Sequence, residues 1–253
     1  MINPVLFNIG PLEVKWYGVF YLISFIALYF YLDYLRKKDV LKLSKDQVYD
    51  LILYLIVGIV LGARLFHAFV WHPDFYLVNP LDLFKLWDGG MAFHGGLIGA
   101  IIAGLIFSKK HNYKVLKLAD ILVVPAALIL SFGRLVNWIN QEIWGVVYNG
   151  SFCVKDLNDL CRFPYQAAAA IKRFFIFLIL VQSSKKQHKD GFIFWLFILL
   201  SGISRFLLDF YKEDARVFLS LSTGQITSFV MFVLASYVLL KYYKKTGKNE
   251  VSS

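Results

Sequence analysis

The stretch WDGGMAFHGGLIGAIIAGLIF, residues 87–107, passes from an aspartate, a histidine and glycines directly into a long apolar run. A helix that crosses a lipid bilayer needs about 20 predominantly apolar residues, and this run is of that order. The histidine at its start would then lie at the edge of the bilayer, where polar groups are costly. Whether the run is a membrane span depends on the rest of the chain.

The composition indicates an integral α-helical membrane protein. The 253 residues are 58% hydrophobic, and the mean hydropathy is +0.60. The apolar residues fall in long blocks rather than amphipathic stripes, which argues against a soluble protein of this length. The net charge of +10 does not indicate nucleic-acid binding, because the basic residues form short clusters between the apolar blocks. The first fifteen residues do not have the pattern of a cleavable signal peptide.

Seven apolar blocks predict an all-α, polytopic protein with one transmembrane domain over residues 1–253. The blocks cover residues 16–35, 51–71, 89–107, 118–136, 167–182, 191–209 and 224–242. The fifth block is the weakest, because Lys172 and Arg173 follow its alanines by about one turn. Either this helix is tilted, or its first turns lie in the interface and both cations snorkel outward.

The basic residues predict the orientation of the chain. Sixteen of the 27 lysines and arginines lie in the connections after the first, third and fifth blocks and at the C-terminal end, where Lys241 precedes the predicted cytoplasmic tail over 243–253. Six lie on the opposite side. The positive-inside rule then places the N-terminus outside and the C-terminus in the cytoplasm. An outer loop is predicted over 137–166, and it holds Cys153 and Cys161. The sequence is compatible with a disulfide between them and with two free thiols.

Five cations remain inside the predicted spans: Arg64, Arg134, Lys172, Arg173 and Arg205. Arg64, Arg134 and Arg205 each lie late in a predicted span that runs outward. His94 and Tyr17 each begin a span that runs inward. All these polar side chains therefore fall in the outer half of the membrane. Guanidinium groups match phosphate and carboxylate oxygens, so we predict one site for an anionic ligand such as a lipid headgroup.

The segment GRLVNWINQEIWG, residues 133–145, adds further polar groups to the predicted site. If the helix continues, Asn137 lies one turn beyond Arg134, and Asn140 and Glu142 turn to other faces or belong to a break. Such a collection of amides and a carboxylate beside an arginine is typical of a hydrogen-bonded site.

Each of these features also has a simpler interpretation. Arg64 and Arg205 are compatible with snorkelling to the interface, the glycines around His94 with helix packing, and Glu142 with a structural salt bridge. Convergence at one depth favours a site, and three functions fit it: an enzyme acting on an anionic phospholipid, a transporter or flippase, and a non-catalytic lipid-binding protein. No internal repeat supports the transporter. An intramembrane serine protease would need a histidine on another helix to pair with Ser201, and no matching histidine lies late in the chain.

The two motifs at 87–99 and 133–145 resemble those of prolipoprotein diacylglyceryl transferases. Further similarity lies in NIGPLEVKWYG at 8–18, GARLF at 62–66, SGISRFLLDFYKEDA at 201–215 and STGQI at 222–226, so it covers most of the chain. The resemblance implies a bacterial inner-membrane enzyme whose active site faces the outer leaflet. It would transfer the diacylglyceryl group of phosphatidylglycerol to the lipobox cysteine of a preprolipoprotein and release glycerol 1-phosphate. No metal or other cofactor is implied, and we expect a monomer.

The resemblance also implies roles for single residues. The residues expected to be catalytic are Tyr17, His94, Arg134, Glu142 and Arg205. Those expected to bind substrate are Asn137, Asn140, Gly145, Arg64, Gly89 and Gly95. We expect Arg134 and Arg205 to hold the phosphate, and His94 to activate the thiol or to orient its base. Asn137 and Glu142 would order the headgroup and the arginine.

The chain departs from the family pattern at two positions. Ser201 stands where the family usually has a tyrosine, four residues before the late arginine. Ala169 in PYQAAAA, residues 164–170, stands where the family usually has a glutamate. These departures leave a diverged paralogue with another lipid or acceptor as the main alternative.

Overall fold

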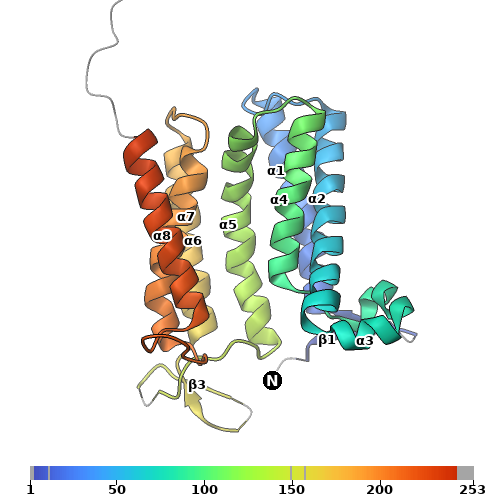
Figure 1. Ribbon diagram of the computed structural model, residues 1–253, viewed down its shortest axis with the longest axis vertical. Coiled ribbons are helices and arrows are strands. Elements are labelled where there is room, and N and C mark those ends of the chain that lie inside the picture. The colour runs from blue at the N-terminus through green and yellow to red at the C-terminus, as the bar shows by residue number, and fades with distance from the viewer. Residues whose placement is uncertain (1–2, 11, 149, 157, 244–253) are drawn as a thin grey trace, which may run out of the picture. The chain divides into compact units, whose positions relative to one another are not determined.

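The computed structural model describes residues 3–10, 12–148, 150–156 and 158–243 (Figure 1). The chain forms two compact units. The N-terminal unit comprises residues 5–118, and the C-terminal unit comprises residues 119–253 together with residues 1–4. Most of the predicted cytoplasmic tail, from residue 244 onward, lies outside the described residues.

All seven predicted blocks form helices. Their bounds are α1 Trp16–Lys37, α2 Lys45–Phe66, α4 Phe93–Lys110, α5 Val115–Ile139, α6 Tyr165–Ser184, α7 Phe192–Leu208 and α8 Thr223–Tyr242. Within the described residues, six helices are long and apolar enough to cross a membrane. The seventh, α4, has 18 residues and ends in Lys109 and Lys110. The prediction of a polytopic helical membrane protein is therefore confirmed, whereas its orientation stays a prediction.

Several short elements were not predicted. An antiparallel hairpin, β1 Val5–Ile9 and β2 Leu12–Lys15, precedes α1. A π-helical turn, η1 His67–Trp71, continues α2 and is followed by α3 Pro73–Val78, η2 Pro80–Phe84 and η3 Leu86–Asp88. In the C-terminal unit, β3 Val154–Lys155 pairs with β4 Cys161–Arg162, and η4 Asp209–Tyr211 follows α7. Most of these elements lie in the long connections between the helices.

Side-chain caps determine where several helices begin. Ser44 and Gln47 form a capping box at the start of α2, and Ser222 and Gln225 form another at the start of α8. The carboxylate of Asp120 in α5 accepts hydrogen bonds from the backbone N–H groups of Gly191 and Phe194, at 2.6 and 2.7 Å. This carboxylate satisfies donors at the first turn of α7, which have no partner within their own helix.

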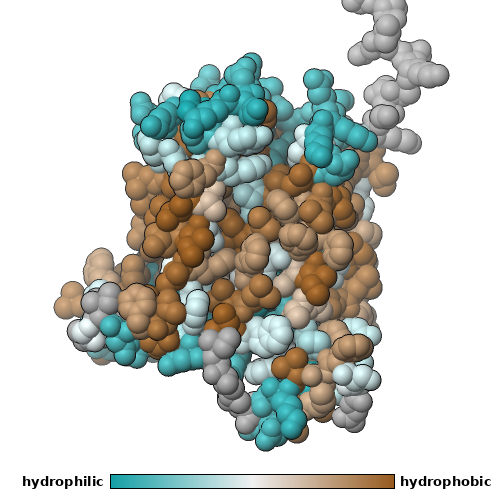
Figure 2. Space-filling model, turned by 180° about the vertical axis from the view of Figure 1, so that it is seen from behind, coloured by the Kyte–Doolittle hydropathy of each residue, from teal (hydrophilic) through white to brown (hydrophobic). Residues whose placement is uncertain are grey.

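Apolar side chains cover the helices between their hydrophilic ends (Figure 2). Large hydrophobic residues on these surfaces are strongly exposed, among them Leu22, Phe30, Leu53, Ile101 and Phe175. A soluble protein rarely exposes such contiguous apolar surface, whereas lipid-facing helices require it.

Glycines bring the backbones of α2 and α4 into direct contact. A Cβ atom added to Gly99 would lie 1.9 Å from the carbonyl oxygen of Gly58, and one added to Gly95 would lie 2.2 Å from that of Gly62. Helix packing in membranes uses small residues in this way, because van der Waals contact replaces the hydrophobic effect as the driving force. The structure therefore gives Gly95 and Gly99 a packing role.

We predict that Gly99→Ala destabilises the protein by about 1–3 kcal/mol, because the added methyl group forces α2 and α4 apart. Gly104→Ala is the matched control, since Gly104 lies on the same helix and has open space around it. This control should change stability by less than about 1 kcal/mol, in the stabilising direction. Thermal unfolding in detergent measures both, and equal midpoints for the two variants would contradict the packing role.

Candidate functional site

A chain of polar side chains extends from the C-terminal part of α5 into the loop that follows it. The Nη1 atom of Arg134 donates to Oδ1 of Asn137 at 3.3 Å, and Nδ2 of Asn137 donates to Oε2 of Glu142 at 3.1 Å. The structure thus brings together three residues that the sequence predicted to lie in one site. Asn137 lies between the guanidinium and the carboxylate and orients both.

This chain exists because α5 stops at Ile139. Gln141 and Ile143 have φ values of +56° and +60°, a conformation in which a helix cannot continue. The backbone then folds back, so that the N–H of Glu142 donates to the carbonyl of Asn137 at 2.9 Å. The side chain of Gln166 in α6 donates to the carbonyl of Glu142 at 2.8 Å and fixes the break. Of the two alternatives predicted for Glu142, the break is the correct one.

Gly145 lies where two segments meet. Its carbonyl accepts from Nη1 of Arg162, and its backbone pairs with Lys212 in an antiparallel bridge. A Cβ atom at this position would lie 2.3 Å from the carbonyl oxygen of Phe163, so only glycine permits the approach. The geometry therefore gives Gly145 a structural role in positioning the loop; whether it also binds substrate stays a prediction.

Arg162 is the central cation of this loop and was not predicted. It is buried and forms ion pairs with Asp156 and with Glu213, the latter at 2.6 Å. The neighbouring Cys161 forms a disulfide with Cys153, which decides between the two alternatives left open by the sequence. The bond with Arg162 holds the pKa of the Asp156 carboxyl below its usual range. The loop is thus held by one covalent bond and by paired charges.

A second polar group joins α6 to the end of α7. Nε of Arg205 donates to Oδ2 of Asp209 at 3.2 Å, and the hydroxyl of Tyr165 donates to the other oxygen of this carboxylate. Asp209 is fully buried, whereas the side chain of Arg205 is 38% exposed. Asp209 therefore fixes the orientation of Arg205 and leaves part of its guanidinium accessible. This pair was not predicted, and the spacing of four residues between Arg205 and Asp209 is the sequence signal that could have indicated it.

Lys172 and Arg173 lie within electrostatic range of Arg134, Arg205 and Asp209. The C-terminal unit thus gathers four cations, contributed by α5, α6 and α7. We call Arg134, Lys172, Arg173 and Arg205 the cation cluster. The sequence interpretation treated Lys172 and Arg173 as snorkelling residues of a weak span. It could not place them near Arg134 and Arg205, because that proximity arises only when α5, α6 and α7 pack together.

Arg64 in the N-terminal unit organises a loop. Its guanidinium donates to the backbone carbonyls of five residues, Asp82, Leu83, Lys85, Gly89 and Gly90. It also lies 5.2 Å from the ring centre of Tyr76, and the residue is only 4% exposed. The sequence suggested that Arg64 and Gly89 bind substrate. The geometry makes Arg64 the anchor of residues 82–90, and the carbonyl of Gly89 one of its acceptors; whether either residue also binds substrate stays a prediction.

His94 and Tyr17 also belong to the N-terminal unit. His94 is the second residue of α4 and is exposed, with its ring centre 6.2 Å from that of Phe66 and 5.9 Å from that of Phe93. Tyr17 is the second residue of α1 and stacks on Tyr21. The exposed imidazole is accessible to a reactant. The predicted convergence of His94 with Arg134 at one site stays a prediction.

The remaining predicted positions have clear surroundings. Asn140 follows the last turn of α5, and its Oδ1 atom is buried without a hydrogen-bond partner among the described residues. Ala169 is 1% exposed in α6, and its methyl side chain brings no charge to this position. Ser201 is half-buried in α7. Across the described residues, no three histidine, cysteine, aspartate or glutamate side chains are placed to hold a metal ion.

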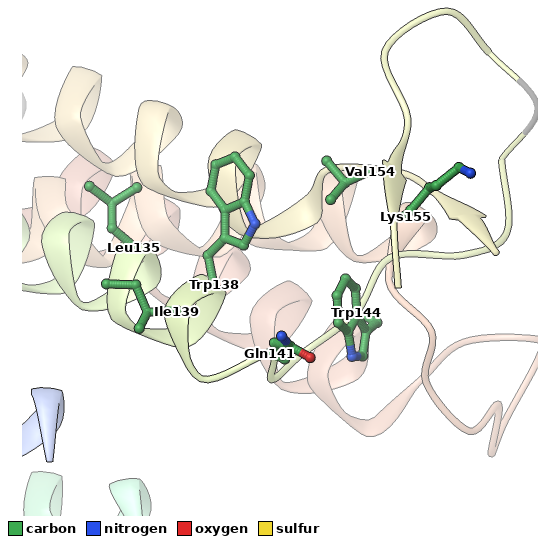
Figure 3. A pocket seen from close by; sticks show the side chains of 7 residues that line it. All are labelled: Leu135, Trp138, Ile139, Gln141, Trp144, Val154 and Lys155. Carbon is green, nitrogen blue, oxygen red and sulfur yellow. The ribbon is translucent and has the colours of Figure 1, made fainter. Parts of the chain in front are cut away.

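A pocket of about 420 Å³ lies beside the break at the end of α5 (Figure 3). Its lining is mostly apolar and consists of Leu135, Trp138, Ile139, Gln141, Trp144, Val154 and Lys155. Lys155 extends away from the other lining side chains (Figure 3). The lining suits a hydrocarbon chain or apolar side chains rather than a phosphate group.

Sequence comparisons relate the chain to one family of known proteins. The family model of prolipoprotein diacylglyceryl transferase matches residues 4–241. The chain is 38% identical to a phosphatidylglycerol–prolipoprotein diacylglyceryl transferase of Geobacter sulfurreducens, over 97% of this chain and 98% of that protein. It is 36% identical to the Tolumonas auensis protein of that name, over 94% of both chains, and 35% identical to that of Rickettsia bellii, over 95% of both.

We predict that Arg64→Gln loosens the segment 82–90, because it leaves partly buried carbonyls without their donors, at a cost of about 0.5–1.5 kcal/mol each. Arg64→Lys should loosen the same segment, since one ammonium group cannot reproduce the planar set of donors of a guanidinium. Arg36→Gln is the control, because Arg36 pairs only within its own helix. Hydrogen exchange of residues 82–90 checks the prediction, and unchanged protection in Arg64→Gln would refute the anchoring role.

The pH dependence of the loop follows from Asp156. Because its pKa is lowered in the folded protein, its stabilising effect is present above the ordinary carboxyl pKa and is lost as the pH falls through the folded value. We expect the loop over 144–163 to lose protection from hydrogen exchange below about pH 4. Asp156→Asn should remove this transition, and the exposed Asp159→Asn should keep it. A transition that persists in Asp156→Asn would assign it to another group.

Proposed function

Because the chain belongs to the prolipoprotein diacylglyceryl transferase family, we propose that it transfers the diacylglyceryl group of phosphatidylglycerol to a cysteine thiol of preprolipoproteins. Glycerol 1-phosphate is the second product. The protein is a multi-pass membrane protein, and the lipid donor therefore reaches it within the bilayer. We further propose that the N-terminus lies outside, so that the reaction takes place at the outer leaflet of the inner membrane.

The observation that supports this function best is that neighbouring side chains orient two arginines in the C-terminal unit. Arg134 is oriented by Asn137, and Arg205 is oriented by the buried Asp209. Guanidinium groups held in fixed orientations among apolar helices suit a phosphate whose negative charge grows as a bond breaks. Asn137 and Glu142 would order the glycerol headgroup by their hydrogen-bonding groups.

We propose that His94 prepares the acceptor. A thiol attacks carbon as the thiolate, so its proton must be taken up by a base. The exposed imidazole at the start of α4 is available for this step. Tyr17, at the start of α1, would support the reacting groups. The roles of these two residues derive from the motifs in which they lie.

We predict that His94→Gln and Arg134→Ala each lower the transfer rate at least about 100-fold, because each removes a group that acts in the transition state. Purified protein in detergent is mixed with phosphatidylglycerol and a lipobox peptide, and the peptide mass is followed. Wild-type protein should add one diacylglyceryl unit.

Two controls belong to this assay. A peptide with serine in place of its cysteine should stay unmodified, and Lys185→Gln, at the exposed far end of α6, should keep the wild-type rate. Folding of every variant is compared by its thermal unfolding midpoint. A wild-type rate in His94→Gln or Arg134→Ala would remove that residue from the mechanism, and a folded wild-type protein without transfer would refute the function.

A further inference from the structure

Lys172 and Arg173 are directed toward the end of the bundle where Arg134 and Arg205 lie. Ser131 of α5 donates to the carbonyl of Ala170 in α6 at 2.7 Å, and Tyr165 at the start of α6 bonds to Asp209 at the end of α7. Side chains of a helix tilt toward its N-terminus, so the two cations of α6 lean toward Tyr165. Their position is therefore set by contacts on both sides of α6.

One of these two cations has a buried donor that no acceptor of the described residues satisfies. The Nη1 atom of Arg173 is buried and has no hydrogen-bond partner in the described part of the chain. Ala169, one turn earlier on the same helix, is buried and offers no carboxylate. A buried guanidinium nitrogen without an acceptor is costly, so it indicates a ligand that supplies the missing acceptor.

The charges in this region do not balance. When all four of its basic side chains are protonated, the cation cluster carries four positive charges, whereas among the described residues the carboxylates bonded into it are Asp209, through Arg205, and Glu142, through Asn137. Arg162, Asp156 and Glu213 are counted apart from the cluster, because they pair with one another in the loop. The cluster thus has about two positive charges in excess. Phosphatidylglycerol, a phosphodiester, carries only one negative charge.

The reaction itself supplies the second negative charge. The thiol proton passes to a base, the sulfur electron pair forms the C–S bond, and the C–O bond to phosphate breaks with its electron pair remaining on the phosphate oxygen. The monoanionic diester becomes a glycerol phosphate monoester, which is a dianion above its second pKa of about 6.

We propose that Lys172 and Arg173 bind the phosphate monoester dianion, and that they thereby match the charge that the leaving group gains. This inference rests on the proposed function for the identity of the monoester. Arg134 and Arg205 are enough for the diester of the donor lipid. The cations of α6 favour the product-like state, and such preference for developing charge accelerates the bond-breaking step.

Binding of charged ligands tests the proposal without any turnover. Purified protein in detergent at pH 8 is titrated with glycerol 1-phosphate and with its methyl diester, a monoanion, and the thermal midpoint gives both affinities. Phosphatidic acid and phosphatidylglycerol form the lipid arm, which separates a free monoester from a lipid monoester. The wild-type protein should bind the monoester about tenfold or more tightly than the diester.

Variants assign the preference to the two residues. Arg173→Gln and Lys172→Gln should each reduce the preference for the monoester several-fold and leave affinity for the diester nearly unchanged. Lys185→Gln, at the other end of α6, is the control. In the transfer assay, the same variants should show weaker inhibition by glycerol 1-phosphate and a lower kcat at unchanged KM.

The outcomes separate this proposal from the proposed function. Equal affinities for monoester and diester in the wild-type protein would overturn it, even if a variant fails to fold. A preference that survives in both variants would overturn it as well. A preference that is lost in the variants of a protein that transfers nothing would support the dianion site and refute the transferase.

Discussion

A cation among apolar helices is stable only where acceptors or counter-charges surround it, and this constraint explains most of the polar architecture. Arg64 is satisfied by backbone carbonyls of a single loop, which it thereby folds. Arg162 is satisfied by two carboxylates, and it connects the outer loop to the segment that holds Glu213. Both arginines thus have acceptors within the fold, although the sequence alone does not distinguish them from the other arginines.

The cation cluster differs in that its charges are only partly compensated. Asp209 orients Arg205 and Asn137 orients Arg134, but Arg173 has a buried nitrogen for which the described residues offer no acceptor. An enzyme that cleaves a phosphodiester needs such an excess, because the phosphate carries more negative charge after the reaction than before. Oriented but incompletely neutralised arginines are a means of preorganising a site for the later charge distribution.

Backbone geometry supports the same end of the C-terminal unit. The positive φ values at Gln141 and Ile143 stop α5, so that Glu142 folds back to Asn137. Gly145 then permits contact with Phe163, where any side chain would collide. In the N-terminal unit, glycines serve a different purpose, since Gly95 and Gly99 allow α4 to contact α2. Glycines that look alike in the sequence thus have two different roles, close approach of loop segments and packing of helices.

The sequence by itself determined the seven helices, the membrane class and the residues of the polar chain, because apolar block length and local motifs encode them. It did not determine the hairpin, the short loop helices or the disulfide, which depend on contacts between distant residues. Only the tertiary structure separated the anchoring Arg64 from Arg205, and only it brought Lys172 and Arg173 to Arg134. Whether a buried charge has acceptors within the fold or requires a ligand depends on how distant segments pack together, and no single segment of the sequence determines that packing.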